Sequence, residues 1–289
     1  MVPVLFVCFA AASAVFGLLL YIAAGLGVIA ALLYALLFFV LLHLLCLLLF
    51  WAASLSTPTD RPLEKQNPFS RIGIGLMAPL VTFYAGVRPV VNGAEKLPTD
   101  SRFLYVSNHR SLFDPLVVMG YQREWNISFI SKPSNTKIPL GWRIVYAAGY
   151  LSIDRENDRN ALRTILTAAD YLKRDLCSIG IYPEGTRSKT DELLPFHAGS
   201  LKIAQRAKVP IVVAAVHGTE GFRHFRLFHR VPVTLNILEV IPAETVCALR
   251  TQELSDRIRA TVQADLDRDR PGKPASAAAD GQTGTGETL

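Results

Sequence analysis

Almost every position in the first 55 residues is apolar, and no Asp, Glu, Lys or Arg occurs before Asp60. As one helix this stretch would extend about 80 Å at about 1.5 Å per residue, whereas the apolar core of a bilayer is about 30 Å thick. A single crossing would leave an apolar overhang in water, and a cleaved secretory signal would be shorter and carry a basic leader. Two crossings fit, with a break at Gly25-Leu26-Gly27. The pattern therefore predicts a transmembrane helical hairpin over residues 1–55.

Polar positions return after the hairpin, and two short segments lead into the rest of the chain. Residues 56–69 contain Pro and charged side chains and are predicted to form a linker. Residues 70–92 are again rich in Gly and apolar residues, but Pro79, Arg71 and Arg88 argue against a third crossing. We interpret 70–92 as an interfacial or groove-lining helical segment, and a buried core helix explains the pattern equally well.

Between residues 93 and 270, short apolar runs alternate with helical patterns. Strands are expected at 103–106, 127–130, 178–182, 211–216 and 233–237. Helices are expected at 115–122, 139–147, 158–174, 198–207 and 250–268, the last of them amphipathic. Such alternation predicts an α/β domain with a largely parallel sheet flanked by helices. The remaining segment, 271–289, is rich in Gly, Ala, Ser and Thr and is predicted to be a disordered tail.

The formal net charge of +6 belongs entirely to the part of the chain outside the hairpin. A basic domain beside a bilayer is attracted to anionic lipid head groups and to phosphorylated substrates. Arg61, Lys65 and Arg71 follow the hairpin directly, so the positive-inside rule places the domain on the cytoplasmic face of an inner (cytoplasmic) membrane. No basic recognition helix or zinc spacing occurs, so no nucleic-acid partner is expected. The four scattered cysteines predict neither a disulfide framework nor a metal site.

The most informative polar segment is residues 107–114, Ser-Asn-His-Arg-Ser-Leu-Phe-Asp, directly after the first predicted strand. Histidine moves protons near neutral pH, and a carboxylate on its other ring nitrogen fixes its tautomer. Residues five apart lie on different sides of a helix, so His109 and Asp114 meet only if the histidine precedes the helix. A capping box starting at Ser111, or an N-cap at Asp114 before Pro115, would place it there. On this segment alone, a catalytic pair and a capping aspartate beside a surface histidine are equally good explanations.

A second polar segment, Tyr182-Pro183-Glu184-Gly185-Thr186-Arg187-Ser188, follows another predicted strand. Ligands bind at the carboxyl ends of strands in open α/β sheets. Gly185 permits close backbone approach, Thr186 offers a hydroxyl, and Arg187 offers a planar fork suited to phosphate oxygens. Glu184 is a group that would hold Arg187 or another base in position. By itself the segment is explained equally by a solvated Glu–Arg turn.

Two further cations stand at the ends of predicted strands. Arg155 closes the short strand that begins at Gly149, where it follows Asp154, and Lys132 ends the strand that covers 127–131. Taken singly, the first is explained by a surface salt bridge and the second by a solvated lysine.

Taken in order, these segments resemble the four sequence blocks of the glycerolipid acyltransferases, most nearly the 1-acyl-sn-glycerol-3-phosphate (lysophosphatidic acid) acyltransferases. The matching stretches are Asn108-His109-x4-Asp114, Gly149-x3-Ile153-Asp154-Arg155, Glu184-Gly185-Thr186-Arg187 and Pro210 before an apolar strand. Phe196-His197-Ala198-Gly199-Ser200 is also similar to a stretch of the family, whereas Lys132-Pro133-Ser134-Asn135-Thr136 departs from its usual Lys-Lys-Glu-Leu type. The resemblance covers roughly residues 80–245.

The resemblance implies transfer of a fatty acyl group from a thioester to the sn-2 hydroxyl of 1-acyl-glycerol-3-phosphate, which gives phosphatidate. His109 would be the general base and Asp114 would orient it. The acceptor phosphate would be bound by Arg187 with Thr186 and Gly185, supported by Glu184, and further candidates for the same duty are Arg155 and Lys132.

The expected partners are a lysophospholipid acceptor, membrane lipids, and either acyl-CoA or acyl carrier protein as the acyl donor. Neither a cofactor nor a metal is expected. No serine or cysteine nucleophile is needed, because the substrate hydroxyl itself attacks the thioester. Three alternatives stay open on sequence alone. They are the same chemistry on another lysophospholipid, a non-catalytic membrane-tethered binder of anionic lipids, and a hydrolase that activates water.

Overall fold

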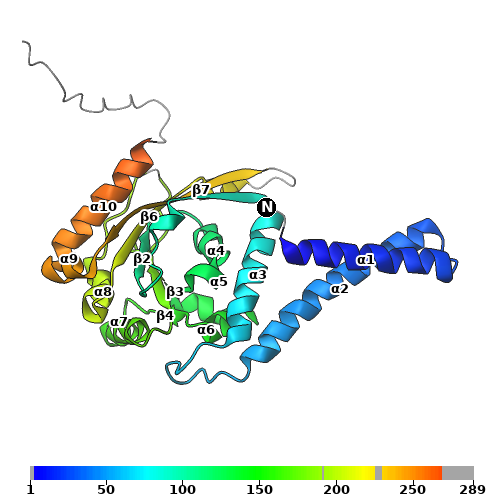
Figure 1. The fold of residues 1–289 in the computed structure, drawn as a ribbon, viewed down its shortest axis with the longest axis horizontal. Coiled ribbons are helices and arrows are strands. Elements are labelled where there is room, and N and C mark those ends of the chain that lie inside the picture. The colour runs from blue at the N-terminus through cyan, green and yellow to red at the C-terminus, as the bar shows by residue number, and fades with distance from the viewer. Residues whose placement is uncertain (1–2, 191, 225–229, 269–289) are drawn as a thin grey trace, which may run out of the picture.

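A helical hairpin projects from one side of the protein (Figure 1). The computed structural model describes residues 3–190, 192–224 and 230–268. The hairpin consists of α1 (Val4–Ala23) and α2 (Val28–Ser54), so the break lies where Gly25 and Gly27 predict it. Both helices are long and apolar enough to cross a membrane, and most of their large apolar side chains are exposed. Exposed apolar helices of this kind fit a bilayer environment.

The third helix, α3 (Pro68–Tyr84), lies across the base of the hairpin and joins it to the rest of the protein (Figure 1). Its N-cap residue Asn67 accepts a hydrogen bond from the backbone N–H of Ser70, and Pro68 occupies the first turn. Tyr84, the last residue of α3, hydrogen-bonds His43 of α2 over 2.9 Å. These contacts attach the hairpin to α3.

The prediction of a helical segment over 70–92 is right for its first part and wrong for its last. Strand β1 (Val87–Asn92) follows α3 after Gly86, whose φ of 75° ends the helix. The strand lies at one edge of the sheet, where Pro89 is tolerated because an edge residue can leave a ladder position unpaired. The helical part packs against α2 and α1 and against α4, α5 and α6. It is therefore a joining helix, half-buried between the hairpin and the domain.

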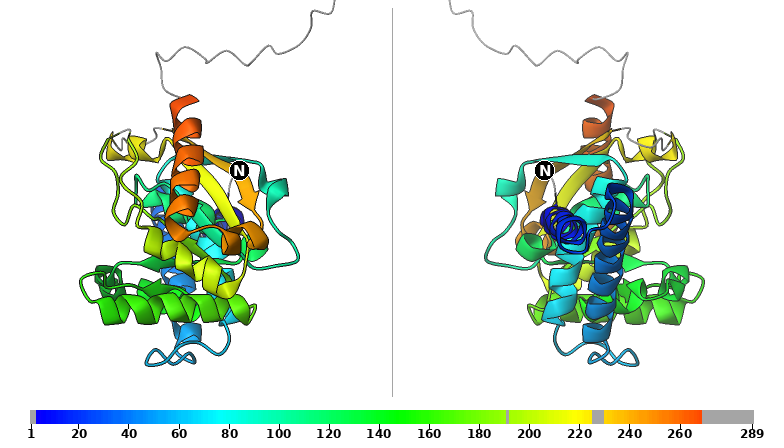
Figure 2. Two further views of the ribbon diagram at one scale, coloured as in Figure 1. Left: turned by 90° about the vertical axis from the view of Figure 1, so that its left-hand side faces the viewer. Right: turned by 90° about the vertical axis from the view of Figure 1, so that its right-hand side faces the viewer.

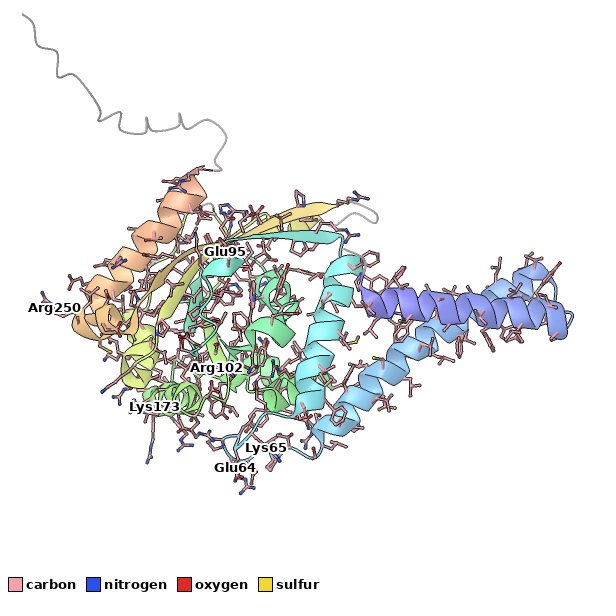
Figure 3. All side chains as sticks on the ribbon, in the orientation of Figure 1. Glu64, Lys65, Glu95, Arg102, Lys173 and Arg250 are labelled. Atoms are coloured by element: carbon pink, nitrogen blue, oxygen red, sulfur yellow. The ribbon has the colours of Figure 1, made fainter. Side chains whose placement is uncertain are left out.

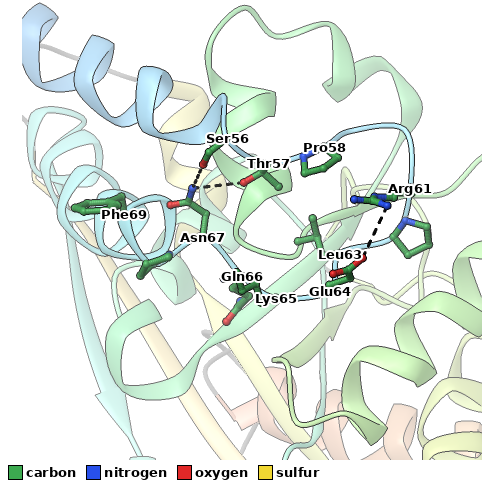
Figure 4. Close-up of a pocket in the computed structure, with 12 residues that line it drawn as sticks. Ser56, Thr57, Pro58, Arg61, Leu63, Glu64, Lys65, Gln66, Asn67 and Phe69 are labelled. Atoms are coloured by element: carbon green, nitrogen blue, oxygen red, sulfur yellow. Dashed lines mark hydrogen bonds and ion pairs between the residues drawn. The ribbon is translucent and has the colours of Figure 1, made fainter.

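The linker between α2 and α3 is held against the domain. The backbone N–H of Leu63 donates to the hydroxyl of Tyr171, and the guanidinium of Arg174 donates to the Leu63 carbonyl. Leu63 is buried in the core on that side of the sheet. Figure 4 shows the shallow pocket of about 330 Å³ that the linker encloses, where the Asn67 amide donates to the hydroxyls of Ser56 and Thr57. The linker therefore fixes where the hairpin leaves the domain.

The sheet has the order β1-β7-β6-β2-β5-β3-β4. Five of its strands are mutually parallel: β2 (Leu104–Ser107), β3 (Ile127–Ser131), β4 (Leu151–Ser152), β5 (Ser178–Ile181) and β6 (Ile211–His217). Strand β7 (Val231–Ile241) runs antiparallel to β6 and parallel to β1. The predicted largely parallel sheet is confirmed, with an antiparallel pair added at one side.

Helices cover both faces of the sheet. One face carries α7 (Asp158–Lys173), α8 (Lys202–Ala207) and α10 (Thr251–Arg268), and the other carries α3, α4 (Phe113–Met119) and α6 (Gly141–Ala147). The shorter elements are α5 (Gln122–Trp125), α9 (Ala243–Ala248), η1 (Ala94–Lys96), η2 (Pro133–Lys137), η3 (Ala198–Leu201) and η4 (Thr219–His224). Successive residues of β2 alternate between the two cores, with Leu104 and Val106 on one face and Tyr105 on the other. Helix α10 lies on the side away from the hairpin (Figures 1 and 2).

The predicted helices and strands match this architecture closely, with small differences at their ends. The amphipathic helix predicted at 250–268 is α10, and the segment predicted at 198–207 is divided between η3 and α8. The predicted tail, 271–289, lies outside the described residues.

Candidate active site

Three neighbouring parallel strands, β6, β2 and β5, end at the same edge of the sheet, with β2 between the other two. One residue beyond the end of β2, the buried side chain of Asn108 continues the hydrogen bonding between β2 and β6. Its amide donates to the carbonyl of Val216 over 2.9 Å, and its oxygen accepts from the Val216 N–H over 2.8 Å. The side-chain amide thus adds one more pair of hydrogen bonds between the ends of β2 and β6. It fixes the chain at the point where His109 follows.

The structure brings His109 and Asp114 together. Nδ1 of His109 lies 2.7 Å from Oδ2 of Asp114, which also accepts from the backbone N–H groups of Arg110 and Ser111. The contact with Ser111 is half of the predicted capping box, whereas the Ser111 hydroxyl accepts from Phe113 instead of Asp114. Helix α4 begins at Phe113, two residues before the predicted start, so the fully buried Asp114 lies in its first turn.

The second oxygen of Asp114 has a partner that the sequence analysis missed. Oδ1 accepts a hydrogen bond from the hydroxyl of Thr219, which lies 2.5 Å away and is fully buried. Thr219 follows β6, and its position just beyond the carboxyl end of a parallel strand is the one sequence signal that points to it.

The imidazole of His109 stacks on Tyr182. The ring centroids are 4.2 Å apart with an angle of 15° between the planes, and the other face of Tyr182 stacks on Phe129. Burial raises the pKa of Tyr182 well above its usual value, so the phenol is neutral, and its hydroxyl has no hydrogen-bond partner among the described residues. Tyr182 therefore serves as a stacking surface, and nothing in its residue type predicted that.

Of the two kinds of partner expected for Glu184, Arg187 or another base, the structure shows His109 and not Arg187. Its buried carboxylate accepts from the backbone N–H of His109 over 2.6 Å and from that of Leu194 over 2.9 Å. Burial raises the pKa of Glu184, while these two hydrogen bonds and the nearby His109 act in the opposite direction. The carboxylate joins the loop after β2 to the loop after β5. It supports the site and does not line the pocket.

Gly185 has a left-handed backbone, with φ of 75°, and it lies against a cation from a third segment. The guanidinium of Arg155 donates to the Gly185 carbonyl, and a Cβ at this position would collide with that guanidinium. The structure therefore unites two of the predicted segments, those ending at Arg155 and starting at Glu184.

His109 opens onto a pocket of about 330 Å³ whose rim is cationic. The predicted residues Lys132, Arg155, Thr186 and Arg187 all line it, from loops after three different strands. Within the described part of the chain, the side chains of Lys132 and Arg187 make no hydrogen bond or ion pair, and both are exposed. They are available to an anionic ligand.

The walls of this pocket are mostly apolar. They come from α4, β3, α6 and the segment before α6, and include Leu112, Leu116, Met119, Phe129, Ile130, Ile138, Trp142, Val145 and Tyr150. An apolar chamber with a cationic rim suits an amphipathic anion such as a lipid phosphate. Among the residues that the structure describes, no group of three or more His, Cys, Asp or Glu is placed to hold a metal ion.

The arrangement supports proton transfer. With the imidazole proton on Nδ1 and directed at Asp114, Nε2 of His109 is left as an acceptor beside the pocket. A buried carboxylate in this position stabilises the imidazolium that forms when Nε2 takes a proton. A hydroxyl held in the pocket is thus a suitable proton donor to His109.

Comparison with known proteins gives consistent matches. Residues 88–217 match the family model named Acyltransferase. The human 1-acyl-sn-glycerol-3-phosphate acyltransferase beta is 28% identical over 185 residues, which is 63% of this chain and 66% of that protein. The 1-acyl-sn-glycerol-3-phosphate acyltransferases of Escherichia coli and Cocos nucifera are 28% and 32% identical over 60% and 53% of this chain. The chain spans 73% of the first and 50% of the second.

A solved structure agrees with these relatives. The crystal structure of the 1-acyl-sn-glycerophosphate (LPA) acyltransferase PlsC from Thermotoga maritima is similar with a TM-score of 0.56 at 27% sequence identity. The similarity covers 71% of this chain and 82% of that one. It therefore extends beyond the residues that match the family model.

Proposed function

We propose that this chain, whose residues 88–217 match the Acyltransferase family model, acylates the sn-2 hydroxyl of 1-acyl-glycerol-3-phosphate to give phosphatidate. The observation that carries the proposal is the His109–Asp114 pair at the edge of an apolar pocket with a cationic rim. The apolar walls suit an acyl chain, and the rim suits the phosphate of the acceptor. The relatives that share the domain are named for the same reaction.

The reaction needs a base because an alcohol is a weak nucleophile until its proton is removed. In the proposed mechanism Nε2 of His109 takes that proton as the hydroxyl oxygen attacks the thioester carbonyl. The tetrahedral intermediate then collapses, the bond from carbon to sulfur breaks, and the leaving thiolate accepts the proton from the imidazolium. Base assistance of this kind contributes about 10² to 10⁴ in rate.

Asp114 acts on His109 and not on the substrate. Its Oδ2 accepts from Nδ1, which selects the tautomer with Nε2 free and stabilises the imidazolium. Oδ2 also accepts hydrogen bonds from two backbone N–H groups, and these fix the position of the carboxylate.

Arg187 is the proposed principal phosphate ligand, with Thr186 and Gly185 beside it. Its guanidinium is exposed at the pocket rim and has no competing partner among the described residues. The guanidinium of Arg155 already donates to the Gly185 carbonyl, so its proposed role is to hold the rim of the pocket in shape. Burial lowers the pKa of this guanidinium. Lys132 adds a further positive charge from the end of β3.

The hairpin would hold this site at the membrane, where the one-chain acceptor resides. We propose that α1 and α2 cross an inner (cytoplasmic) membrane with the domain on its cytoplasmic face, since the basic residues that follow the hairpin favour that side. The donor is an acyl thioester, either acyl-CoA or acyl carrier protein, and the reaction as proposed needs no cofactor.

A matrix of lysolipid acceptors against both donors, with purified wild type and Arg187→Ala, tests the proposed function. Wild type should prefer 1-acyl-glycerol-3-phosphate to lysolipids with larger head groups. Loss of one charged hydrogen-bonding group should raise the acceptor KM of Arg187→Ala by roughly tenfold and leave the donor KM unchanged.

The matched control is Arg250→Ala, which removes an exposed arginine at the start of α10 on the far side of the domain (Figure 3). It should behave as wild type. An unchanged acceptor KM in Arg187→Ala would remove Arg187 from the phosphate role. Release of free fatty acid without acceptor, at the rate of transfer, would favour a hydrolase over the proposed transferase.

A further inference from the structure

We propose that Thr219 is a positioning residue for the reaction, and that its hydroxyl holds the carboxylate of Asp114 in the orientation that His109 needs. The inference rests on the proposed function, because it assigns a task to Thr219 only if the His109–Asp114 pair moves the proton. Among the described residues, the hydroxyl of Thr219 is hydrogen-bonded to Asp114, and Thr219 does not line the pocket. Its effect on His109 would therefore pass through Asp114.

The two carboxylate oxygens of Asp114 accept different numbers of hydrogen bonds. Oδ2 accepts from Nδ1 of His109 and from the backbone N–H groups of Arg110 and Ser111, at 2.7 to 2.8 Å. Oδ1 accepts only from the Thr219 hydroxyl within the described contacts, at 2.5 Å. Because Asp114 is fully buried, water is not available to replace a lost donor at Oδ1. Thr219 therefore both stabilises the charged carboxylate and fixes its rotation.

The backbone around Thr219 is held from several directions. Gly218, with φ of 83°, turns the chain beneath β7, and a Cβ at that position would collide with the carbonyl oxygen of Pro232. On the other side of that turn, Nε2 of His217 lies 2.8 Å from the carboxylate of Asp265 in α10. Together with the Asn108 side chain that joins β2 to β6, these contacts set where the Thr219 hydroxyl lies relative to Asp114.

Loss of the hydroxyl should reduce turnover and spare substrate binding. A carboxylate without its Oδ1 donor can rotate and occupy orientations in which Nδ1 of His109 is poorly bound, which lowers the fraction of enzyme with a correctly set base. Neither substrate contacts Thr219, because this residue does not line the pocket. Poor binding of Nδ1 would also stabilise the imidazolium less. The acidic limb of the kcat/KM profile should therefore move to lower pH.

The test compares Thr219→Val, which removes the hydroxyl at nearly constant volume, with Thr219→Ser, which keeps it. In the full-length protein, Thr219→Val should lower kcat by roughly tenfold or more with both KM values unchanged, and should shift the acidic limb to lower pH. Thr219→Ser should recover most of the wild-type kcat and the wild-type profile. Thr82→Val is the matched control, since Thr82 is also buried but donates to a carbonyl of its own helix.

The inference would be overturned by wild-type kcat in Thr219→Val, by an unshifted pH profile, or by equal losses in Thr219→Val and Thr219→Ser. If Thr219→Val lost activity only in proportion to its loss of folded protein, as Thr82→Val would, the role would be structural and the inference wrong. His109→Ala in the same assay separates this from the proposed function. An active His109→Ala would contradict the proposed function itself, whereas an inactive one with normal Thr219→Val would contradict the inference alone.

Discussion

His109 is held by contacts from its own loop and from residues 182–188, which are distant in the sequence. Its Nδ1 is bound by Asp114, its ring face lies on Tyr182, and its backbone N–H is bound by Glu184. Its carbonyl accepts from the N–H of Ser188. With so many of its groups engaged, the imidazole is left with Nε2 for chemistry. This restraint is the kind of preorganisation that keeps a catalytic base in one geometry.

The stacking role of Tyr182 predicts different outcomes for two substitutions. Tyr182→Phe keeps the ring that lies between His109 and Phe129 and removes a buried hydroxyl without a described partner. It should keep wild-type kcat and equal or slightly exceed wild-type stability. Tyr182→Ala should lower kcat and destabilise the fold by about 3 to 5 kcal/mol. Activity assays with thermal unfolding in detergent decide this; a Tyr182→Phe as impaired as Tyr182→Ala would assign a role to the hydroxyl.

The contacts of a site residue could be predicted from the sequence only where the two partners lie close together in the chain. His109 and Asp114 meet within one turn, so their spacing and the adjoining helix start made the pair one of two equally good explanations, and the family resemblance favoured it. Glu184 binds His109 across 75 positions, and Thr219 binds Asp114 across 105. Such contacts depend on which strands become neighbours, which residue types do not reveal. For Glu184 the sequence therefore left two partners open, Arg187 or another base, and the structure shows His109.

The elements of the fold were predicted best where hydrophobic periodicity was strong and flanking turns were clear. The five predicted strands and the helices of the α/β domain occur within a few residues of their expected positions. Strand β1 was missed because its Pro89 and short apolar run, directly after a helical pattern, resemble the end of a helix. Its place at the sheet edge, beside β7, depends on pairing across more than a hundred residues.

Helix α10 is attached to the sheet by Asp265, and this attachment should depend on pH. Burial by itself would raise the pKa of Asp265, but hydrogen bonds from His217 and Asn236 and the nearby positive charges lower it below its ordinary 3.8. A carboxyl with a lowered folded-state pKa stabilises the fold above the unfolded value, and this stability is lost as pH falls through the folded value.

Asp265→Asn should therefore be less stable than wild type at pH 7, and the difference should shrink as pH falls below about 4. Thermal unfolding of both proteins in detergent across this range measures it. Asp256→Asn, at an exposed position of the same helix, is the control and should track wild type at every pH. A gap between Asp265→Asn and wild type that stays constant down to the acid range would disprove a charge-dependent contact.

At the scale of the whole molecule, the hairpin and helix α10 lie on opposite sides of the α/β domain (Figure 1). The site lies at the carboxyl edge of the parallel strands, and the joining helix α3 packs on both the hairpin and α4, the helix that begins with Phe113 and Asp114. The hairpin is thus connected to α4, the helix that carries Asp114, through a single layer of packing. The sequence predicted both parts but not this connection, because α3 is apolar on more than one side.

Chemical labelling of a native cysteine tests on which side of the membrane the domain lies. Cys247 is exposed in α9, whereas Cys177 is fully buried and the other two cysteines belong to the hairpin. A membrane-impermeant maleimide should label Cys247 in cells only after the membrane is permeabilised, if the domain faces the cytoplasm. Cys247→Ser identifies the labelled site. Labelling of intact cells that disappears in Cys247→Ser would place the domain on the outer face.

The measurement that tests the account most directly is phosphatidate formation by wild type and His109→Ala from 1-acyl-glycerol-3-phosphate and a labelled acyl thioester. The account predicts that His109→Ala folds, associates with membranes and binds the acceptor as wild type does, yet transfers the acyl group at least about 100-fold more slowly. Phosphatidate formation by His109→Ala at a rate close to that of wild type would contradict it.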